Sequence, residues 1–197
     1  MIGPAVTSDQ PAVAALDAAC FPKDAWSSGS WADEFAREDR QILVAETPPG
    51  DSATPPGDPA TPPGDPATPP GDSATPPGER STPPGESSQV VPTADTAGPG
   101  SMLGFVVLLV PAAAEDPVDL LRIAVDPAYR RTGLGRRLLT AALEHHPTRT
   151  VLLEVAAGNK AAIGLYRGFG FREISRRRGY YAAGEDAVIM QRAGEDS

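Results

Sequence analysis

Short apolar runs and stretches with helical periodicity alternate along this chain of 197 residues. Runs rich in leucine and β-branched residues and bounded by turn residues predict strands, which lie at 2–6, 41–46, 103–110, 120–125, 150–155, 171–181 and 185–191. Apolar residues spaced three and four apart predict helices, which lie at 11–20, 30–37, 136–145 and 159–166. The order β-α-α-β-β-β-α-β-α-β-β predicts a mixed α/β (α+β) domain.

A proline-rich insert separates the second predicted strand from the third. Six copies of a seven-residue unit of the type TPPGDSA run from Thr47 to Ser88, and a polar stretch continues to Ser101. Segment 47–101 holds 16 of the 23 prolines and almost no large apolar side chain. Such a composition cannot bury enough surface to offset the entropy lost on ordering, which predicts a disordered insert that acts as a spacer. The remainder, 1–46 and 102–193, is long enough for a single domain.

Charge and cysteine content narrow the class of protein. Of the net charge of −9, the insert carries −6 and the remainder −3, which argues against direct binding to nucleic acid. No run approaches the ~20 apolar residues that span a bilayer, so no membrane contact is expected. A single cysteine, Cys20, excludes an intrachain disulfide. Together with a start that does not resemble a signal peptide, it predicts a cytoplasmic protein.

The motif Arg130-Arg131-Thr132-Gly133-Leu134-Gly135 lies between the strand 120–125 and the helix 136–145. A glycine-rich turn that opens a helix presents free backbone N–H groups and the positive end of the helix dipole, which favours a phosphate or pyrophosphate. Arg130, Arg131 and Arg136 add positive charge for the same anion. The spacing matches neither a Walker loop nor a dinucleotide-binding fingerprint. The alternative at this point is an ordinary turn at the start of a helix.

Glu154 and Tyr166 are the candidate proton-transfer residues. Glu154 is the one acid in the apolar strand 150–155, and such a carboxylate can act as a general base. Alternation alone equally allows Glu154 to lie on the exposed face of an edge strand. Tyr166 alone could be a half-buried aromatic residue with a solvated hydroxyl group. The pair His145-His146 has no third ligand at a suitable spacing, so no metal site is predicted.

The region from Ile123 to Met190 resembles the GNAT superfamily of N-acetyltransferases, and within it the bacterial ribosomal-protein alanine N-acetyltransferases of the RimI type. The resemblance rests on the joint order and spacing of several short motifs. These are Ile123-Ala124-Val125-Asp126-Pro127, Tyr129 through Gly135, Leu153-Glu154-Val155, Asn159, Ala162, Leu165-Tyr166, Gly170-Phe171, Arg177, Tyr180-Tyr181, Asp186-Ala187 and Met190. The insert is not part of the family pattern, and Ala156 stands where the family often has arginine.

The resemblance implies a GNAT fold, with a central mixed, mostly antiparallel sheet flanked by helices. In this family acetyl-CoA lies in a cleft between two strands that splay apart, which here would be 120–125 and 151–155. The backbone of Ile123, Ala124 and Val125 would pair with the pantetheine arm. The turn from Arg130 to Arg136 would hold the pyrophosphate, and Asn159 would contact the pantetheine further along. Residues 102–193 would therefore form the cofactor-binding and catalytic part of the domain.

The resemblance also assigns roles in the reaction. Glu154 matches the family's proton acceptor, and Tyr166 matches the proton donor to the departing CoA thiolate. Tyr180 and Tyr181 would contact an incoming peptide. The expected activity is acetylation of a protein N-terminus, specifically the N-terminal alanine of a small-subunit ribosomal protein. The alternatives are a small-molecule amine or lysine acetyltransferase of the same fold, and a non-catalytic CoA-binding scaffold.

Overall fold

The computed structural model describes residues 1–47, 101–181 and 184–195, so nearly all of the predicted disordered insert lies outside the described residues. The strands are β1 (Ile2–Pro4), β2 (Arg40–Glu46), β3 (Met102–Leu109), β4 (Val118–Val125), β5 (Val151–Ala156), β6 (Arg172–Arg177) and β7 (Ala187–Arg192). The α-helices are α1 (Gln10–Cys20), α2 (Ser28–Ala36), α3 (Leu134–Glu144) and α4 (Lys160–Arg167). Their order along the chain is the one that the hydrophobic pattern predicts.

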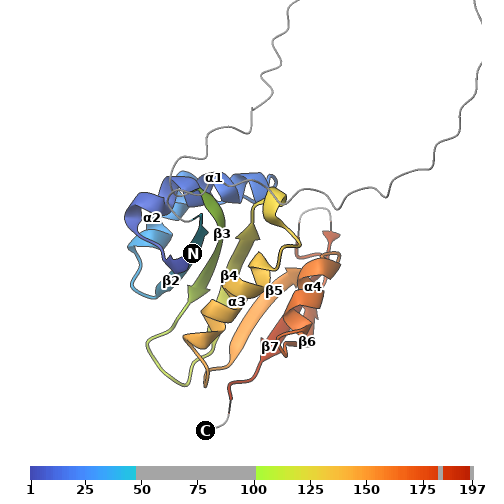
Figure 1. Ribbon diagram of the computed structural model, residues 1–197. Helices are drawn as coiled ribbons and strands as arrows, with labels where there is room; N and C mark the ends of the chain where they lie inside the picture. Colours follow the sequence, from blue (N-terminus) through green and yellow to red (C-terminus); the bar gives the residue numbers. More distant parts are fainter. Residues whose placement is uncertain (48–100, 182–183, 196–197) are drawn as a thin grey trace, which may run out of the picture.

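The strands form one sheet in the order β1-β2-β3-β4-β5-β7-β6 (Figure 1). The β4–β5 pair is parallel, and every other neighbouring pair is antiparallel. A parallel pair needs a crossover connection, and α3 supplies it between β4 and β5. The prediction of a mixed, mostly antiparallel sheet flanked by helices is therefore confirmed.

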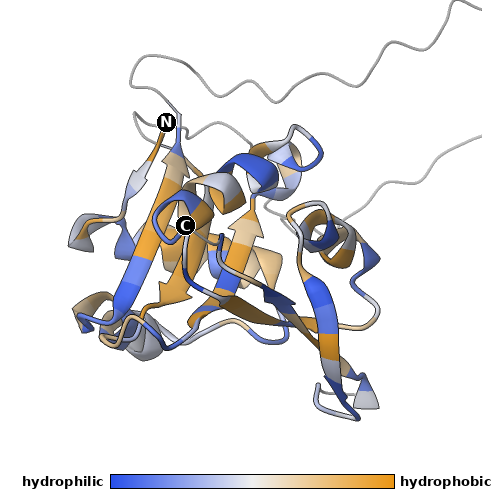
Figure 2. Cartoon of the chain, turned by 90° about the horizontal axis from the view of Figure 1, so that it is seen from below, coloured by the Kyte–Doolittle hydropathy of each residue, from blue (hydrophilic) through white to orange (hydrophobic). Residues whose placement is uncertain are grey.

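Two apolar clusters fill the two sides of the sheet. The larger cluster joins α3 and α4 to one face, which lies in front in Figure 1. The smaller cluster joins α1 and α2 to the other face around Trp31 and Phe105, both 0% exposed. Figure 2 shows that the hydrophobic residues concentrate on the central strands. Among the described residues, no helix has both the length and the apolar character needed to cross a membrane.

Element ends differ from the predicted ones for local reasons. Helix α2 begins at Ser28, two residues early, because Ser27 caps it by accepting a hydrogen bond from the N–H of Ser30 at 3.0 Å. Strand β6 ends at Arg177, four residues early. Gly179 there has a φ of 60°, and its N–H donates to Asp186 Oδ1 at 3.0 Å. A left-handed residue cannot continue a strand, so the chain turns at Gly179.

The insert leaves and re-enters the domain at one point. The N–H of Thr47 donates to the carbonyl oxygen of Ser101 at 3.1 Å. The N–H of Ser101 donates to Thr47 Oγ1, also at 3.1 Å. Strands β2 and β3 pair antiparallel directly beyond these bonds. The two ends of the insert are thus held together where the hairpin of β2 and β3 opens. We call the hydrogen-bonded pair Thr47 and Ser101 the neck.

Gly104 on β3 allows the sheet and α3 to approach closely. A Cβ atom there would lie 2.8 Å from the carbonyl oxygen of Ala124 and 2.9 Å from Leu138 Cδ1. We expect Gly104→Val to lower the free energy of unfolding by about 1–3 kcal/mol through overpacking, measured by urea denaturation. Gly3→Val on β1 is the control, because no described heavy atom lies within 4 Å of the Cβ position at Gly3. An equal loss in both variants would contradict this explanation.

Candidate functional site

Strands β4 and β5 diverge at the centre of the sheet. They pair at Val118–Val151, Asp119–Leu152 and Leu120–Leu153, and no further pair follows, although β4 continues to Val125 and β5 to Ala156. Leu121, the next residue of β4, is the extra residue of a bulge, since Leu108 pairs with Leu120 and Val107 with Arg122. A bulge increases the local twist of a strand and bends it, which turns β4 away from β5.

At the opening, β4 has a free strand edge from Ile123 to Val125, where the outward backbone groups are those of Ile123 and Val125. Residues 123–125 pair with Val106, Phe105 and Gly104 of β3 on one side only, within the part of the chain that the structure describes. An extended ligand with amide groups can pair with such an edge as an added strand would. The contact of this edge with the pantetheine arm, which the resemblance implies, stays a prediction.

The turn into α3 has a backbone suited to an anion. Arg131 has a φ of 65° and Gly133, the N-cap residue of α3, a φ of 86°. No described heavy atom lies within 4 Å of the Cβ position at Gly133, so the space in front of it is open. Thr132 Oγ1 donates to the carbonyl oxygen of Tyr129 at 2.7 Å and holds the turn in place. Leu134 is buried, so a ligand would reach its backbone rather than its side chain.

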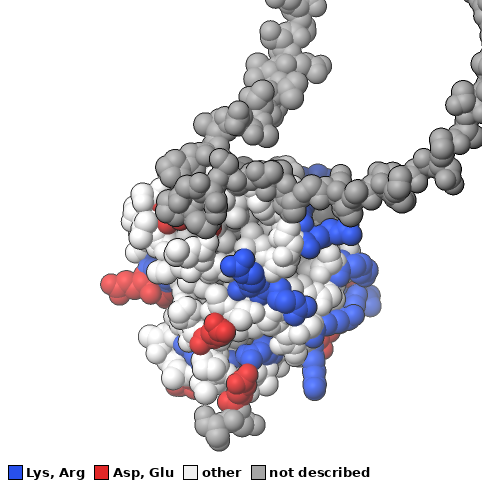
Figure 3. Space-filling view, in the orientation of Figure 1, with Lys and Arg blue, Asp and Glu red and all other residues white. Residues whose placement is uncertain are grey.

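The arginines of this turn have different surroundings. Arg130 Nε donates to the carbonyl oxygen of Val125 at 3.3 Å, so the Arg130 side chain points back to the end of β4. Arg136 lies over the ring of Phe169, with 5.1 Å from Cζ to the ring centroid. Arg131 is exposed. Figure 3 shows Lys and Arg side chains gathered on the face that carries α3 and α4, a face suited to a polyphosphate.

The two glycines of the motif differ in whether their backbone conformation requires glycine. Gly133 is left-handed, and a side chain there costs about 1–2 kcal/mol. At Gly135 a Cβ atom would make ordinary contacts, 3.6 Å to Val125 and 3.7 Å to Leu165, inside a helix where alanine is preferred by about 0.5–1 kcal/mol. We expect Gly133→Ala to lower and Gly135→Ala to preserve or raise the melting temperature, measured by calorimetry. Equal losses would contradict the difference in backbone requirement.

Glu154 lies on the interior strand β5, so the alternative of an edge strand is wrong. Leu153 and Val155 face the cluster under α3 and α4, and Glu154 therefore faces the side of α1 and α2. Its side chain is nevertheless 31% exposed, because β4 has already turned away at this level. Arg177 reaches across β7 from β6, and its Nη1 lies 2.8 Å from Glu154 Oε1.

Tyr166 lies on the other face of the sheet. It belongs to the cluster under α3 and α4 and is 5% exposed, more buried than the alternative of a half-buried aromatic residue requires. Burial raises the pKa of Tyr166, and the neighbouring Tyr181 raises it further. Burial and the carboxylate of Glu154 likewise raise the pKa of Tyr181. Tyr166 is therefore protonated near neutral pH.

The remaining predicted residues, Tyr180 and Asn159, make local contacts. The ring of Tyr180 is 52% exposed and meets that of Tyr181 edge-on, with 5.2 Å between centroids. Asn159 is the N-cap of α4, where its Oδ1 accepts from the N–H of Ala162 at 3.1 Å. The contact with the pantetheine arm that the resemblance implies for Asn159 stays a prediction.

Sequence reasoning missed three polar contacts near the opening. Arg177 pairs with Glu154, Glu185 Oε1 accepts from the N–H of Gly158 at 2.7 Å, and Arg122 pairs with Asp17 at 2.9 Å. The one available signal was Arg122, a single charge within the apolar run 120–125. The other contacts join segments distant in the sequence, and no local pattern indicates them.

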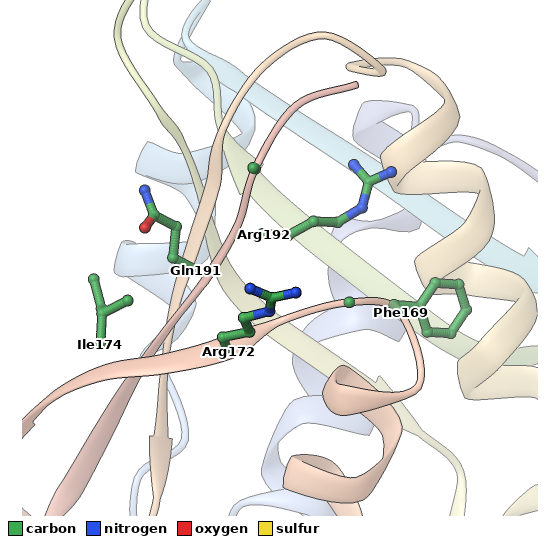
Figure 4. A pocket seen from close by; sticks show the side chains of 7 residues that line it. Phe169, Arg172, Ile174, Gln191 and Arg192 are labelled. Atoms are coloured by element: carbon green, nitrogen blue, oxygen red, sulfur yellow. The ribbon is translucent and has the colours of Figure 1, made fainter. Parts of the chain in front are cut away.

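A pocket of about 400 Å³ lies elsewhere (Figure 4). Its lining consists of Phe169, Gly170, Arg172, Ile174, Gln191, Arg192 and Ala193. Gln191 pairs with Leu152 of β5, at the level where β4 and β5 are still joined. None of the predicted site residues lines this pocket, so it is separate from the opening.

Comparison with known proteins agrees with this geometry. A family model described as the acetyltransferase (GNAT) family matches residues 73–171. The "[Ribosomal protein bS18]-alanine N-acetyltransferase" of Salmonella typhimurium is 48% identical over 81 residues, covering 38% of this chain and 55% of the relative. The protein with the same name from Escherichia coli is 45% identical over 97 residues, covering 46% of this chain and 64% of the relative. The chain thus matches about 55–64% of the length of these curated relatives.

The fold has solved counterparts. The crystal structure of the ribosomal-protein-S18-alanine N-acetyltransferase from Escherichia coli superimposes with a TM-score of 0.64 at 28% identity, covering 100% of this chain and 97% of that one. The "N-alpha-acetyltransferase RimI" of Mycobacterium tuberculosis is 47% identical over 75 residues, covering 38% of this chain and 48% of the relative. The divergent strands, the turn into α3 and the matched residues lead to one conclusion: the chain belongs to the GNAT family of acetyltransferases.

Proposed function

We propose that this protein is an N-α-acetyltransferase that transfers the acetyl group of acetyl-CoA to the N-terminal alanine of a ribosomal protein or a similar protein N-terminus. One observation carries the proposal. Glu154 lies on β5 where β4 has turned away and faces the side of α1 and α2, and Tyr166 lies on the other face of the sheet, under α3 and α4. The names of the relatives from Salmonella typhimurium and Escherichia coli support the choice of acceptor.

The residues present fit acetyl-CoA as co-substrate. The free edge at Ile123, Ala124 and Val125 suits the amides of the pantetheine arm. The open turn at Gly133 and the exposed Arg131 and Arg136 suit the pyrophosphate. Bound there, acetyl-CoA supplies the activated thioester carbon. A backbone N–H of the free edge would stabilise the oxyanion that develops at that carbon.

Glu154 and Tyr166 would divide the proton transfers between them. An N-terminal ammonium has a pKa of about 7.7–8.0, so Glu154, directly or through a water, can accept a proton to free the amine. The raised pKa of Tyr166 keeps its hydroxyl protonated at neutral pH, so it can donate a proton to the departing thiolate. The two residues approach from opposite faces, which suits direct attack with both substrates bound and no covalent enzyme intermediate.

The acceptor would enter on the side of α1 and α2, past Tyr180 and Tyr181. Tyr180 lies under Arg177, the ion-pair partner of Glu154, and its ring meets that of Tyr181, so both rings can contact the first residues of a peptide. Ribosomal proteins are made in the cytoplasm, so the proposal places the enzyme there and requires neither a metal nor nucleic acid.

The test is thiol release from acetyl-CoA with the full chain and a panel of short peptides that differ at the first residue. Free lysine and polyamines serve as controls, with one peptide whose N-terminus is blocked. We expect turnover confined to free α-amines and fastest for alanine. Turnover of the small amines instead would overturn the acceptor assignment, and acetyl-CoA binding without any turnover would overturn the assignment as an enzyme.

A further inference from the structure

Arg122 makes an unusual set of contacts for a residue on a central strand. Its side chain is 10% exposed, and its Nη1 lies 2.9 Å from Oδ2 of Asp17 on α1, which is 0% exposed. Its Nη2 donates to the carbonyl oxygen of Asp24 at 2.6 Å. The guanidinium also lies over two aromatic rings, with its Cζ 4.4 Å from the centroid of Phe21 and 4.7 Å from that of Trp26. One side chain thus binds α1 and both ends of the following loop, 21–26.

The same carboxylate holds the loop from the other side. Asp17 Oδ2 accepts from the backbone N–H of Trp26 at 2.8 Å and from Trp31 Nε1 at 3.3 Å. Its other oxygen, Oδ1, is buried and has no hydrogen-bond partner among the described residues. Breaking a buried charge pair is costly, so Asp17 and Arg122 fix each other and the loop 21–26 together.

The bulge that opens the sheet also directs Arg122. Without the extra residue Leu121, alternation from Val118 and Leu120 would place Arg122 on the face of α3 and α4. With the bulge, Arg122 lies on the face of α1, next to the free edge at Ile123. The bulge at Leu121 therefore has two effects. It turns β4 away from β5, and it directs Arg122 to the side where it holds the loop 21–26.

This loop lies on the side of the sheet that Glu154 faces. Cys20, the residue before the loop, donates from its Sγ to the carbonyl oxygen of Val125 at 3.4 Å, at the free edge of β4. We propose that Arg122 is a positioning residue that holds the loop 21–26, with Phe21 and Trp26, as the fixed wall of the acceptor-peptide site. This inference rests on the proposed function, and it assigns to Arg122 no contact with acetyl-CoA.

Arg122→Lys is the most informative variant. Lysine keeps a positive charge opposite Asp17 but lacks the planar guanidinium that bonds Asp17 and Asp24 through separate nitrogens and packs on the two rings. Phe21 and Trp26 would then have to be ordered when the peptide binds, so we expect the KM for the peptide to rise about tenfold. The Kd for acetyl-CoA and the melting temperature should change little. A merely structural role would lower the active fraction, and thus kcat, without changing the KM.

Arg149→Lys is the matched control. Arg149 also holds a loop through its guanidinium, since it donates to the carbonyl oxygens of Pro111, Ala113 and Asp116. Its loop joins β3 to β4 at the closed end of the sheet, where Val118 and Val151 pair. We expect this variant to leave the KM for the peptide unchanged. An equal rise in both variants would overturn the specific role of Arg122.

Amide hydrogen exchange provides a readout that does not need activity. Arg122→Lys should raise exchange in 21–26, and Arg149→Lys should raise it in 111–116 instead. Unchanged exchange in 21–26, or faster exchange there with an unchanged KM for the peptide, would overturn the proposal. If the unsubstituted chain turns over no peptide, the proposed function fails, and with it the acceptor role of Arg122. The exchange data would still decide whether Arg122 holds the loop.

Discussion

Glu154→Gln is expected to lower kcat for peptide acetylation by about 10²–10⁴-fold and to leave the Kd for acetyl-CoA unchanged. Loss of a positioned general base typically costs this much, and glutamine keeps the size of the side chain. Tyr166→Phe should cause a loss of the same order, because it removes only the hydroxyl group that would donate to the thiolate. The measurements are steady-state kinetics by thiol release and acetyl-CoA binding by calorimetry.

Glu173→Gln is the control for Glu154→Gln. Glu173 also lies on a strand and pairs with an arginine, Arg176, but on the exposed edge strand β6. Its replacement should change kcat by less than about twofold, because surface ion pairs contribute little. Normal turnover by Glu154→Gln, or a loss explained by weaker acetyl-CoA binding, would contradict the role assigned to Glu154.

Trp31→Ala is expected to lower the free energy of unfolding by about 3–5 kcal/mol, the usual cost of truncating a buried aromatic residue. Trp31 is 0% exposed, and its ring meets Phe105 edge-on, with 5.3 Å between centroids, and lies 4.9 Å from that of Trp26. The variant also removes one hydrogen-bond donor from the buried Asp17. A loss of this size is a large fraction of the stability of a typical domain, and urea denaturation will measure it.

Tyr180→Ala is the control for Trp31→Ala. The ring of Tyr180 is 52% exposed, so its removal should change the free energy of unfolding by less than about 0.5 kcal/mol. Comparable losses in the two variants would show that Trp31 is not the centre of the cluster under α1 and α2.

The fold could be predicted from the sequence because its elements carry strong local signals. The motif before α3, the apolar runs of β3, β4 and β5, and the spacing of Leu134, Leu138 and Leu139 each indicate one type of element. Element ends were less predictable, since they depend on single contacts such as the cap at Ser27 and the turn at Gly179. These contacts are set by tertiary structure.

For the candidate site, the sequence indicates the residues but not the tertiary contacts that surround them. The turn at Gly133 and the positions of Glu154 and Tyr166 follow from local motifs and from the resemblance to the family. The exposure of Glu154 on an interior strand could not be predicted from local motifs, because it depends on where β4 leaves β5. The bulge at Leu121 that causes this has no signature in its own residues. The contacts of Arg122 with Asp17 and of Arg177 with Glu154 join distant segments, which periodicity cannot indicate.

The hydrogen-bonded neck at Thr47 and Ser101 has a consequence for how the gene can change. The mouth of the hairpin is closed by the domain itself, so whole seven-residue copies can be gained or lost without altering the pairing of β2 and β3. Chain closure adds only about 0.6 kcal/mol for each doubling in length. Copy number in the repeat tract is therefore free to drift between related lineages at almost no cost to folding.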